Sequence, residues 1–66
     1  MIPKMIIESL IDNFVYIYIK DISKEFAGKL QSIKEELGGD ILVLEDKNNN
    51  LVYIPASEIA VITERR

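Results

Sequence analysis

Two periods of hydrophobic residues divide this 66-residue chain. Near the N-terminus, four apolar residues follow Pro3 with the three- and four-residue spacing of an amphipathic helix, namely Met5, Ile6, Leu10 and Ile11. From residue 14 onward the apolar residues mostly alternate, which is the period of a β-strand. The pattern therefore predicts one short helix, over about residues 3–12, and only strands after it.

The alternating part of the chain separates into five predicted strands. Residues 14–19, FVYIYI, are all β-branched or aromatic, with the aromatic side chains on one face. Turn-forming residues lie between the strands, such as the three asparagines 48–50, and Pro55 closes the fourth strand because proline has no N–H to donate. The predicted strands cover about residues 14–21, 24–36, 40–47, 51–55 and 59–63.

A glycine interrupts the second predicted strand, in the segment EFAGKL at residues 25–30. Glycine inside a strand usually marks a bend, a bulge or a close approach of another backbone. After Gly28 the phase slips, because Ile33 is out of step with Leu30. We therefore predict a structural bend at Gly28 that lets five strands curl into a very small barrel.

The chain is small enough that its hydrophobic core needs support. A domain of this size buries only about 60% of the surface that the unfolded chain exposes, which leaves it marginally stable. The chain has no cysteine and no histidine, so disulfides and thiolate or imidazole metal sites are excluded. With 48% hydrophobic residues the composition is that of a folded protein, and self-association is the expected supplement.

Charge and hydropathy argue against several partners. The net charge is −3 and the pI about 4.8, which is the wrong sign for a broad basic nucleic-acid surface, so we expect no DNA partner. The longest apolar run, Phe14 to Ile19, is far shorter than the roughly 20 residues that span a bilayer. We expect no membrane partner and a cytoplasmic location.

Catalytic chemistry has few candidates in this sequence. Without histidine or cysteine, the four serines have only carboxylates and lysines as neighbouring bases. Carboxylates gather near two turns and could hold a hard cation, but solvated surface groups explain them better: Glu35, Glu36, Asp40, Glu45 and Asp46. We therefore predict a protein that is not an enzyme and that has no metal and no cofactor.

The order of elements and two motifs resemble the Sm-like (LSm/Hfq) family. The first motif of that family has an aromatic residue, a glycine and a leucine at alternate positions, which here are Phe26, Gly28 and Leu30, and it closes on an LVLED-type strand, here residues 42–46. The second motif joins two aliphatic strands by a short turn, here residues 52–62. The resemblance covers nearly the whole chain.

The resemblance implies a mainly β fold in a single Sm-like domain over residues 1–66. In that fold a short N-terminal helix precedes a five-stranded, strongly bent SH3-type small barrel. The residues by which the family recognises uridine and phosphate are replaced here. Lys34 occupies the place of an aspartate, and Pro55 and Ala56 occupy the place of an arginine and a glycine.

The family places the loop between the second and third strands at the central opening of a ring. If single-stranded RNA binds there, Lys34 would contact phosphate, Glu36 or Asp40 would accept a hydrogen bond from a base edge, and Tyr53 would offer a stacking surface. Acidic groups around an opening would instead repel a polyanion. A second possible RNA surface combines the aromatic side of the first strand with three lysines, Lys20, Lys24 and Lys29.

The last two strands are short and aliphatic, and an exposed edge of this kind is an aggregation hazard. Family members pair the fourth strand of one copy with the fifth strand of the next, which implies a ring-like homo-oligomer. The predicted interface consists of Leu51, Val52, Tyr53, Ile54, Ile59, Val61 and Ile62. The alternative is that the two edges pair with each other inside one barrel. Two functions stay open: an Sm-like ring that binds RNA at a non-standard site, or an Sm-like structural or protein-interaction oligomer that has lost RNA binding.

Overall fold

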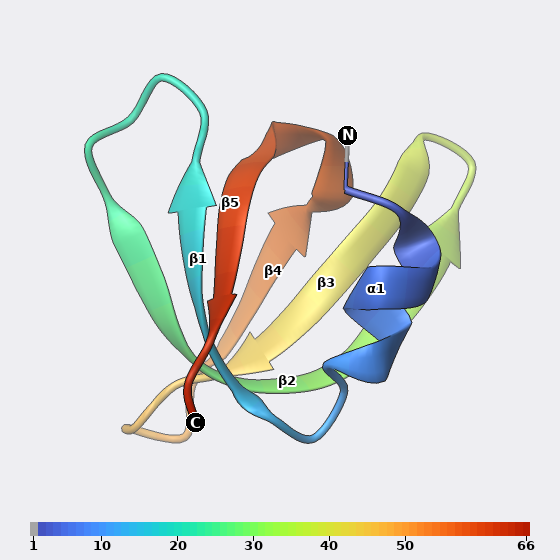
Figure 1. Ribbon diagram of the computed structural model, residues 1–66. Helices are drawn as coiled ribbons and strands as arrows, with labels where there is room; N and C mark the ends of the chain where they lie inside the picture. The colour runs from blue at the N-terminus through green and yellow to red at the C-terminus, as the bar shows by residue number, and fades with distance from the viewer. Residues whose placement is uncertain (1) are drawn as a thin grey trace.

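The computed structural model describes residues 2–66, so Met1 of the predicted domain lies outside the described residues. A short N-terminal helix precedes five antiparallel strands that form one sheet, as the hydrophobic pattern predicts (Figure 1). In chain order the elements are α1 (Lys4–Ser9), β1 (Phe14–Ile19), β2 (Glu25–Glu36), β3 (Gly39–Glu45), β4 (Leu51–Pro55), the 3-10 turn η1 (Ala56–Glu58) and β5 (Ile59–Glu64).

The helix and the first strand are shorter than the predicted ranges 3–12 and 14–21. Helix α1 ends at Ser9, and the chain then turns through Asp12, whose φ is 76°, before it enters β1. Strand β1 ends at Ile19 because Asp21 adopts a φ of 60°, in the left-handed region that a strand cannot contain. Asp and Asn tolerate this region better than other residues with side chains.

The third and fifth strands also differ from their predicted ranges. Strand β3 begins at Gly39 and ends at Glu45, because the next residue, Asp46, enters a tight turn. Its Oδ1 accepts hydrogen bonds from the N–H groups of Asn48 and Asn50, each at 2.9 Å. Strand β5 continues to Glu64, which pairs with Val15 at the start of β1.

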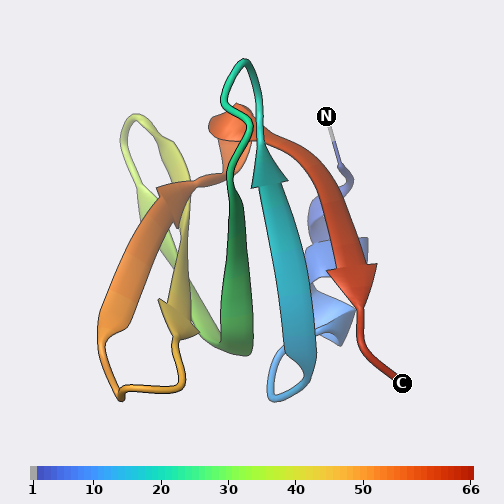
Figure 2. The ribbon, with the colours of Figure 1, turned by 90° about the vertical axis from the view of Figure 1, so that its left-hand side faces the viewer.

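The order of strands across the sheet is β4-β3-β2-β1-β5, so β4 and β5 are its two outer strands. No ladder joins β4 to β5 within residues 2–66, and the alternative in which these edges pair inside one chain is therefore wrong. Strand β2 connects the two sides of the sheet: residues 25–29 pair with β1 and residues 29–36 pair with β3. In both ribbon views the arrows of β4 and β5 point in opposite directions (Figures 1 and 2).

Gly28 lies where the end of β3 comes close to β2. A Cβ atom at position 28 would lie 2.3 Å from the main-chain oxygen of Glu45, a distance that carbon and oxygen atoms do not tolerate. The register with β3 shifts two residues further on, between Leu30 and Ser32. The position therefore needs glycine for close approach of another backbone, and the irregularity that follows it accounts for the phase slip in the sequence.

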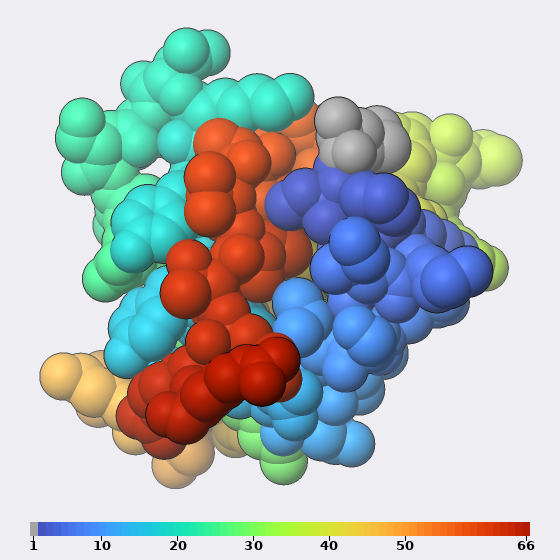
Figure 3. Space-filling view, in the orientation of Figure 1, coloured from blue at the N-terminus to red at the C-terminus, as the bar shows by residue number. Residues whose placement is uncertain are grey.

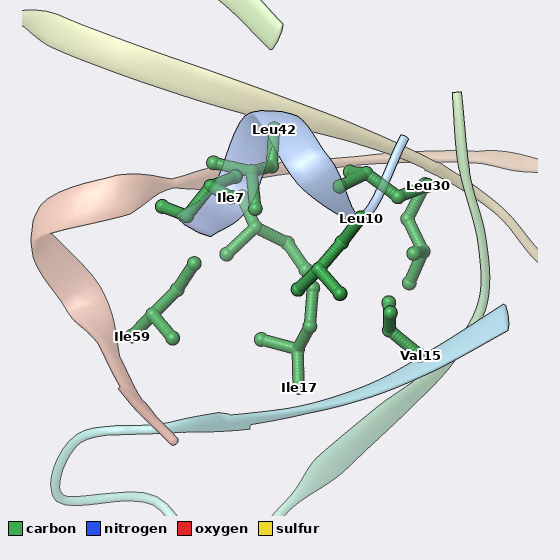
Figure 4. Close-up of a cluster of buried hydrophobic side chains, with 9 residues drawn as sticks. Ile7, Leu10, Val15, Ile17, Leu30, Leu42 and Ile59 are labelled. Carbon is green, nitrogen blue, oxygen red and sulfur yellow. The ribbon is translucent and has the colours of Figure 1, made fainter. Parts of the chain in front are cut away.

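The hydrophobic core lies between α1 and one face of the sheet (Figure 4). Helix α1 contributes Ile7, the residue directly after it contributes Leu10, and the strands contribute seven buried side chains: Val15, Ile17, Leu30, Leu42, Leu44, Ile54 and Ile59. Burial of one such side chain contributes about 1.5–3 kcal/mol. Two main-chain hydrogen bonds fix the segment after the helix, from Asp12 N–H to the Leu30 oxygen at 2.7 Å and from Leu30 N–H to the Asn13 oxygen at 3.0 Å.

Charged side chains also connect α1 to the hairpin of β2 and β3. The Lys4 ammonium donates to Glu35, and it lies 3.9 Å from a carboxylate oxygen of Asp40. This contact raises the pKa of Lys4 and lowers the pKa of Glu35, in each case mainly through their shared hydrogen bond.

Helix α1 and β5 cover adjacent parts of the same face of the molecule (Figure 3).

Candidate functional site

Exposed apolar side chains lie along both outer strands of the sheet. Among residues 2–66, eight large apolar side chains are exposed, and four of them belong to β4, β5 or the strand next to β5: Tyr18, Leu51, Tyr53 and Val61. The side chain of Tyr53 is 57% exposed and that of Val61 is 51% exposed. Exposed apolar groups that follow an unpaired strand edge mark a surface suited to a further strand.

The seven residues of the predicted interface do not all lie at the surface. Leu51, Tyr53 and Val61 are exposed, and Val52 and Ile62 are half-buried. Ile54 and Ile59 belong to the core cluster and point away from solvent. Alternation explains the division in β4, because every second side chain turns toward the core. In β5 a register shift at Ala60 breaks the alternation, so that Ile59 and Ile62 both face the core.

The two edges differ in regularity. Strand β4 pairs with β3 at five consecutive positions without interruption, from Leu51 opposite Glu45 to Pro55 opposite Ile41. Strand β5 has a register shift against β1, because Tyr18 pairs with Val61 whereas Ile19 pairs with Ile59 and leaves Ala60 unmatched. A bulge at an edge is one of the devices by which proteins discourage strand addition. The edge of β4 is therefore the more regular of the two.

The aromatic residues of β1 form a row on the face of the sheet opposite the core. Phe14 and Tyr16 are in edge-to-face contact with ring centroids 5.5 Å apart, and Tyr18 continues the row. The guanidinium of Arg65 lies 4.2 Å from the centroid of Phe14, in a cation–π contact. Lys29 is paired with Phe14 in the ladder of β1 and β2. The row is thus flanked by two cations at one end.

The other end of the aromatic row carries an acidic residue. Tyr18 pairs with Glu25 in the ladder, and its hydroxyl donates a hydrogen bond to the Glu25 carboxylate. This hydrogen bond is the main cause of a raised pKa for Tyr18, because ionised tyrosine could no longer donate it. The row therefore changes from basic surroundings at Phe14 to an acidic neighbour at Tyr18.

The structure divides the residues of the predicted RNA site between two faces of the β2–β3 hairpin. Glu35 and Asp40 pair with each other across the hairpin, and both contact Lys4 of the helix on the core side. Lys34 and Glu36 have the opposite parity along β2 and project to the outer face. Tyr53 shares that outer face. It pairs with Val43, and Val43 is two residues along β3 from Ile41, the ladder partner of Lys34.

The three lysines of the second predicted RNA surface also lie apart. The ammonium of Lys24 lies 5.0 Å from the ring centroid of Phe26, whose ladder partner Ile17 belongs to the core face. Lys29 is on the aromatic face, where its ammonium lies 4.0 Å from a carboxylate oxygen of Asp12. Lys20 is exposed at the end of β1.

One residue beside the aromatic row was missed by reasoning from the sequence. The sequence pattern assigns no role to Arg65, whereas its main-chain N–H donates a hydrogen bond to the Phe14 oxygen at 2.9 Å and its guanidinium lies over the Phe14 ring. The signal was present in the alternation of β5, since Val61, Thr63 and Arg65 have the same parity.

Other kinds of site are not seen in the part of the chain that the structure describes. Residues 2–66 form no enclosed pocket and no group of three side chains placed to hold a metal ion. None of the helices found between residues 2 and 66 has the length and apolar character needed to cross a membrane.

Comparison with known proteins adds no family name to this geometry. No family model, no curated protein and no solved structure matches the chain. The candidate site therefore rests on the strand edges and the aromatic row alone.

Proposed function

We propose that this chain is an Sm-like subunit whose sheet curls into a small SH3-type barrel. The order of one helix, five strands and a 3-10 turn between the last two strands supports the proposal. Strand direction supports it too. In a flat antiparallel sheet of order β4-β3-β2-β1-β5, the two outer strands would run the same way, whereas their arrows point in opposite directions (Figures 1 and 2). A sheet that folds back through β2 has this property.

The function that the geometry supports best is self-assembly through the two outer strands. The observation that carries it is that two outer strands have no second neighbour among residues 2–66 and have exposed apolar side chains beside them, Leu51 and Tyr53 at one edge and Tyr18 and Val61 at the other. When β4 of one copy pairs with β5 of the next, both edges are satisfied and these side chains come together on one continuous face.

The opposite directions of β4 and β5 suit such a joint. Copies related by rotation about a ring axis keep the same end up, so a β4 that points up meets a β5 that points down, in an antiparallel ladder. The contact is heterologous, because two different surfaces meet. Heterologous contacts close into a ring when the rotation between copies allows it. The chain then acts as the repeating unit of a homo-oligomeric ring.

Measurement of the solution mass tests the proposal. Multi-angle light scattering should give several times the 7.6 kDa of one chain. Tyr53→Lys or Val61→Lys should lower the mass to that of one chain, because each places a charge beside an edge. Met5→Lys is the matched control, since Met5 is exposed and belongs to α1 and not to either outer strand. A wild-type mass of one chain at high protein concentration would refute the proposal.

A mixture of the two edge variants tests whether the contact is heterologous. Tyr53→Lys keeps an intact β5 edge, and Val61→Lys keeps an intact β4 edge. An equimolar mixture should form one joint and stop at a heterodimer of twice the monomer mass. If β4 instead paired with β4 in a two-fold contact, Val61→Lys would form dimers without its partner.

Single-stranded RNA binding is the second candidate function. The observation in its favour is the aromatic row of Phe14, Tyr16 and Tyr18 with Arg65 and Lys29 at one end, since bases stack on aromatic rings beside cations. The predicted site at the β2–β3 hairpin is a weaker candidate. Its one cation, Lys34, shares the hairpin with three carboxylates, two of which already contact Lys4 of α1.

Titration of labelled oligouridine and oligoadenine at two salt concentrations tests RNA binding. Affinity that falls with added salt would support it, and no binding at low salt would exclude it. Tyr16→Ala should weaken binding if bases stack on β1, because this side chain lies in the middle of the row. Tyr53→Ala should weaken binding if the hairpin surface is used instead.

A further inference from the structure

Strand β4 has an edge that is open to more than one kind of strand. Its five positions pair regularly with β3, without a bulge, and its far side has no partner among residues 2–66. Alternate residues of an antiparallel strand turn their N–H and C=O groups away from the neighbour. These groups form a template for main-chain hydrogen bonds to an added strand.

Side chains on both faces of β4 favour an aliphatic occupant. Leu51 and Tyr53 are exposed on the outer face, and the half-buried Val52 and the buried Ile54 lie on the core face. A strand added beside them would contact apolar groups above and below its own plane. The middle of β4 carries no charged residue that would discourage such a contact, and Pro55 limits it to about five residues.

Negative charge at one end of β4 indicates which residues an added antiparallel strand would carry at its C-terminal end. Leu51 pairs with Glu45, and Asp46 follows at the same end of the strand. An antiparallel peptide on β4 would bring its own C-terminal end to this end of the strand. Glu45 lies across β4 on β3 and accepts a hydrogen bond from Gln31, and Asp46 accepts two from the turn, so the attraction acts through their negative charge and not through direct contact. Basic residues directly after the aliphatic run would therefore be attracted there.

We propose that the β4 edge binds an extended peptide of another protein, with four or five aliphatic residues followed by basic residues, as an added antiparallel strand. The inference rests on the proposed self-assembly in one respect, because β5 of a second copy occupies the same edge. A bound peptide would therefore cap a growing assembly. Strand β5 is a poorer acceptor, since the bulge at Ala60 interrupts its edge.

The test uses the full-length Val61→Lys variant, in which self-assembly is expected to be blocked and the β4 edge is free. The probe is a synthetic peptide, Val-Ile-Val-Ile-Thr-Arg-Arg, and binding is followed by backbone amide shifts in nuclear magnetic resonance. We expect saturable shifts confined to β3 and β4. N-methylation at alternate peptide nitrogens should weaken binding at least about tenfold, because it removes ladder hydrogen bonds.

Two further variants sharpen the result. A peptide with both arginines replaced by glutamate should bind about threefold to tenfold more weakly at low salt, and the difference should shrink at high salt. Adding Tyr53→Lys to the protein should weaken binding, whereas adding Met5→Lys should not. Shifts outside β3 and β4, or shifts that N-methylation leaves unchanged, would overturn the proposal, as would no saturation at millimolar peptide.

The outcome is independent of whether the wild-type chain assembles. A monomeric wild type that binds the peptide at β4 would refute self-assembly and leave the peptide site standing. An assembled wild type whose Val61→Lys variant is monomeric but does not bind the peptide would refute the peptide site and leave self-assembly standing.

Discussion

Gly28 and Glu45 approach each other so closely that a methyl group on Gly28 would lie 2.3 Å from the Glu45 carbonyl oxygen. The obstacle is main chain, which cannot rotate away as a side chain could. Strands β2 and β3 therefore approach each other at a point where no side chain fits between them.

We expect Gly28→Ala to lower the free energy of unfolding by about 2–3 kcal/mol, because β2 and β3 must separate to admit the new atom. Urea denaturation followed by circular dichroism measures the change. Gly38→Ala is the matched control, since a Cβ atom there meets nothing within 4 Å, and its effect should stay within about 0.5 kcal/mol. Equal stability of the two variants would show that the close approach is not needed.

Truncation of two leucines in or next to β2 should change the free energy of unfolding by very different amounts. Leu30 is fully buried, and Leu37 is fully exposed at the hairpin tip. Leu30→Ala should lower the free energy of unfolding by about 2–5 kcal/mol, because it leaves a cavity in the core. Leu37→Ala should change it by no more than about 0.5 kcal/mol. Thermal or urea unfolding of both variants would contradict this placement of the core if the losses were similar.

The contact between Lys4 and Glu35 should make stability depend on pH at both extremes. The pKa of Glu35 is lowered in the folded state, so its contribution is present above the unfolded value of 4.5 and is lost as the pH falls through the folded value. The pKa of Lys4 is raised, so its contribution is present below 10.5 and is lost as the pH rises through the folded value.

A charge-removing variant isolates this effect. The urea midpoint of the wild type should exceed that of Lys4→Met at neutral pH, and the difference should shrink in strong acid, in strong base and in high salt. Glu35→Gln should show the same loss in the same pH range. A difference between wild type and Lys4→Met that persists unchanged in acid would mean that the Lys4 side chain acts through packing instead.

Tyr18 should ionise at a higher pH than an ordinary tyrosine, because its hydroxyl donates to Glu25. Ultraviolet difference spectroscopy measures tyrosine ionisation, and Tyr18→Phe identifies the contribution of this residue. Glu25→Gln should lower the pKa of Tyr18 toward its usual value, since the negative charge that opposes ionisation is removed. No movement of the titration in Glu25→Gln would show that the carboxylate is not the cause.

Much of the fold could be predicted from local pattern. The change of hydrophobic period at Phe14 located the transition from helix to strands, and the asparagines at 48–50 located a hairpin turn. Strand ends were less accurate, because they depend on single residues in left-handed backbone such as Asp21, which the sequence does not distinguish from other aspartates.

The candidate site was harder to predict, because it depends on which strands become neighbours. The sequence shows that Tyr53 and Val61 are large apolar residues in predicted strands, but only the strand order shows that both strands are outer ones. The engagement of Asp40 by Lys4 joins residues far apart in the sequence, and nothing local to either residue indicates it. Arg65 is similar, since its contact with Phe14 follows from the pairing of β1 with β5.

The pairing of Val15 with Glu64 has a consequence for synthesis of the chain. A ribosome makes β1 before β5, and β1 then lacks its second neighbour until residues 59–64 have been translated. Until β5 leaves the exit tunnel, the nascent protein exposes the aliphatic groups that β5 will cover. Chaperones that recognise exposed apolar groups would bind the nascent chain during this interval.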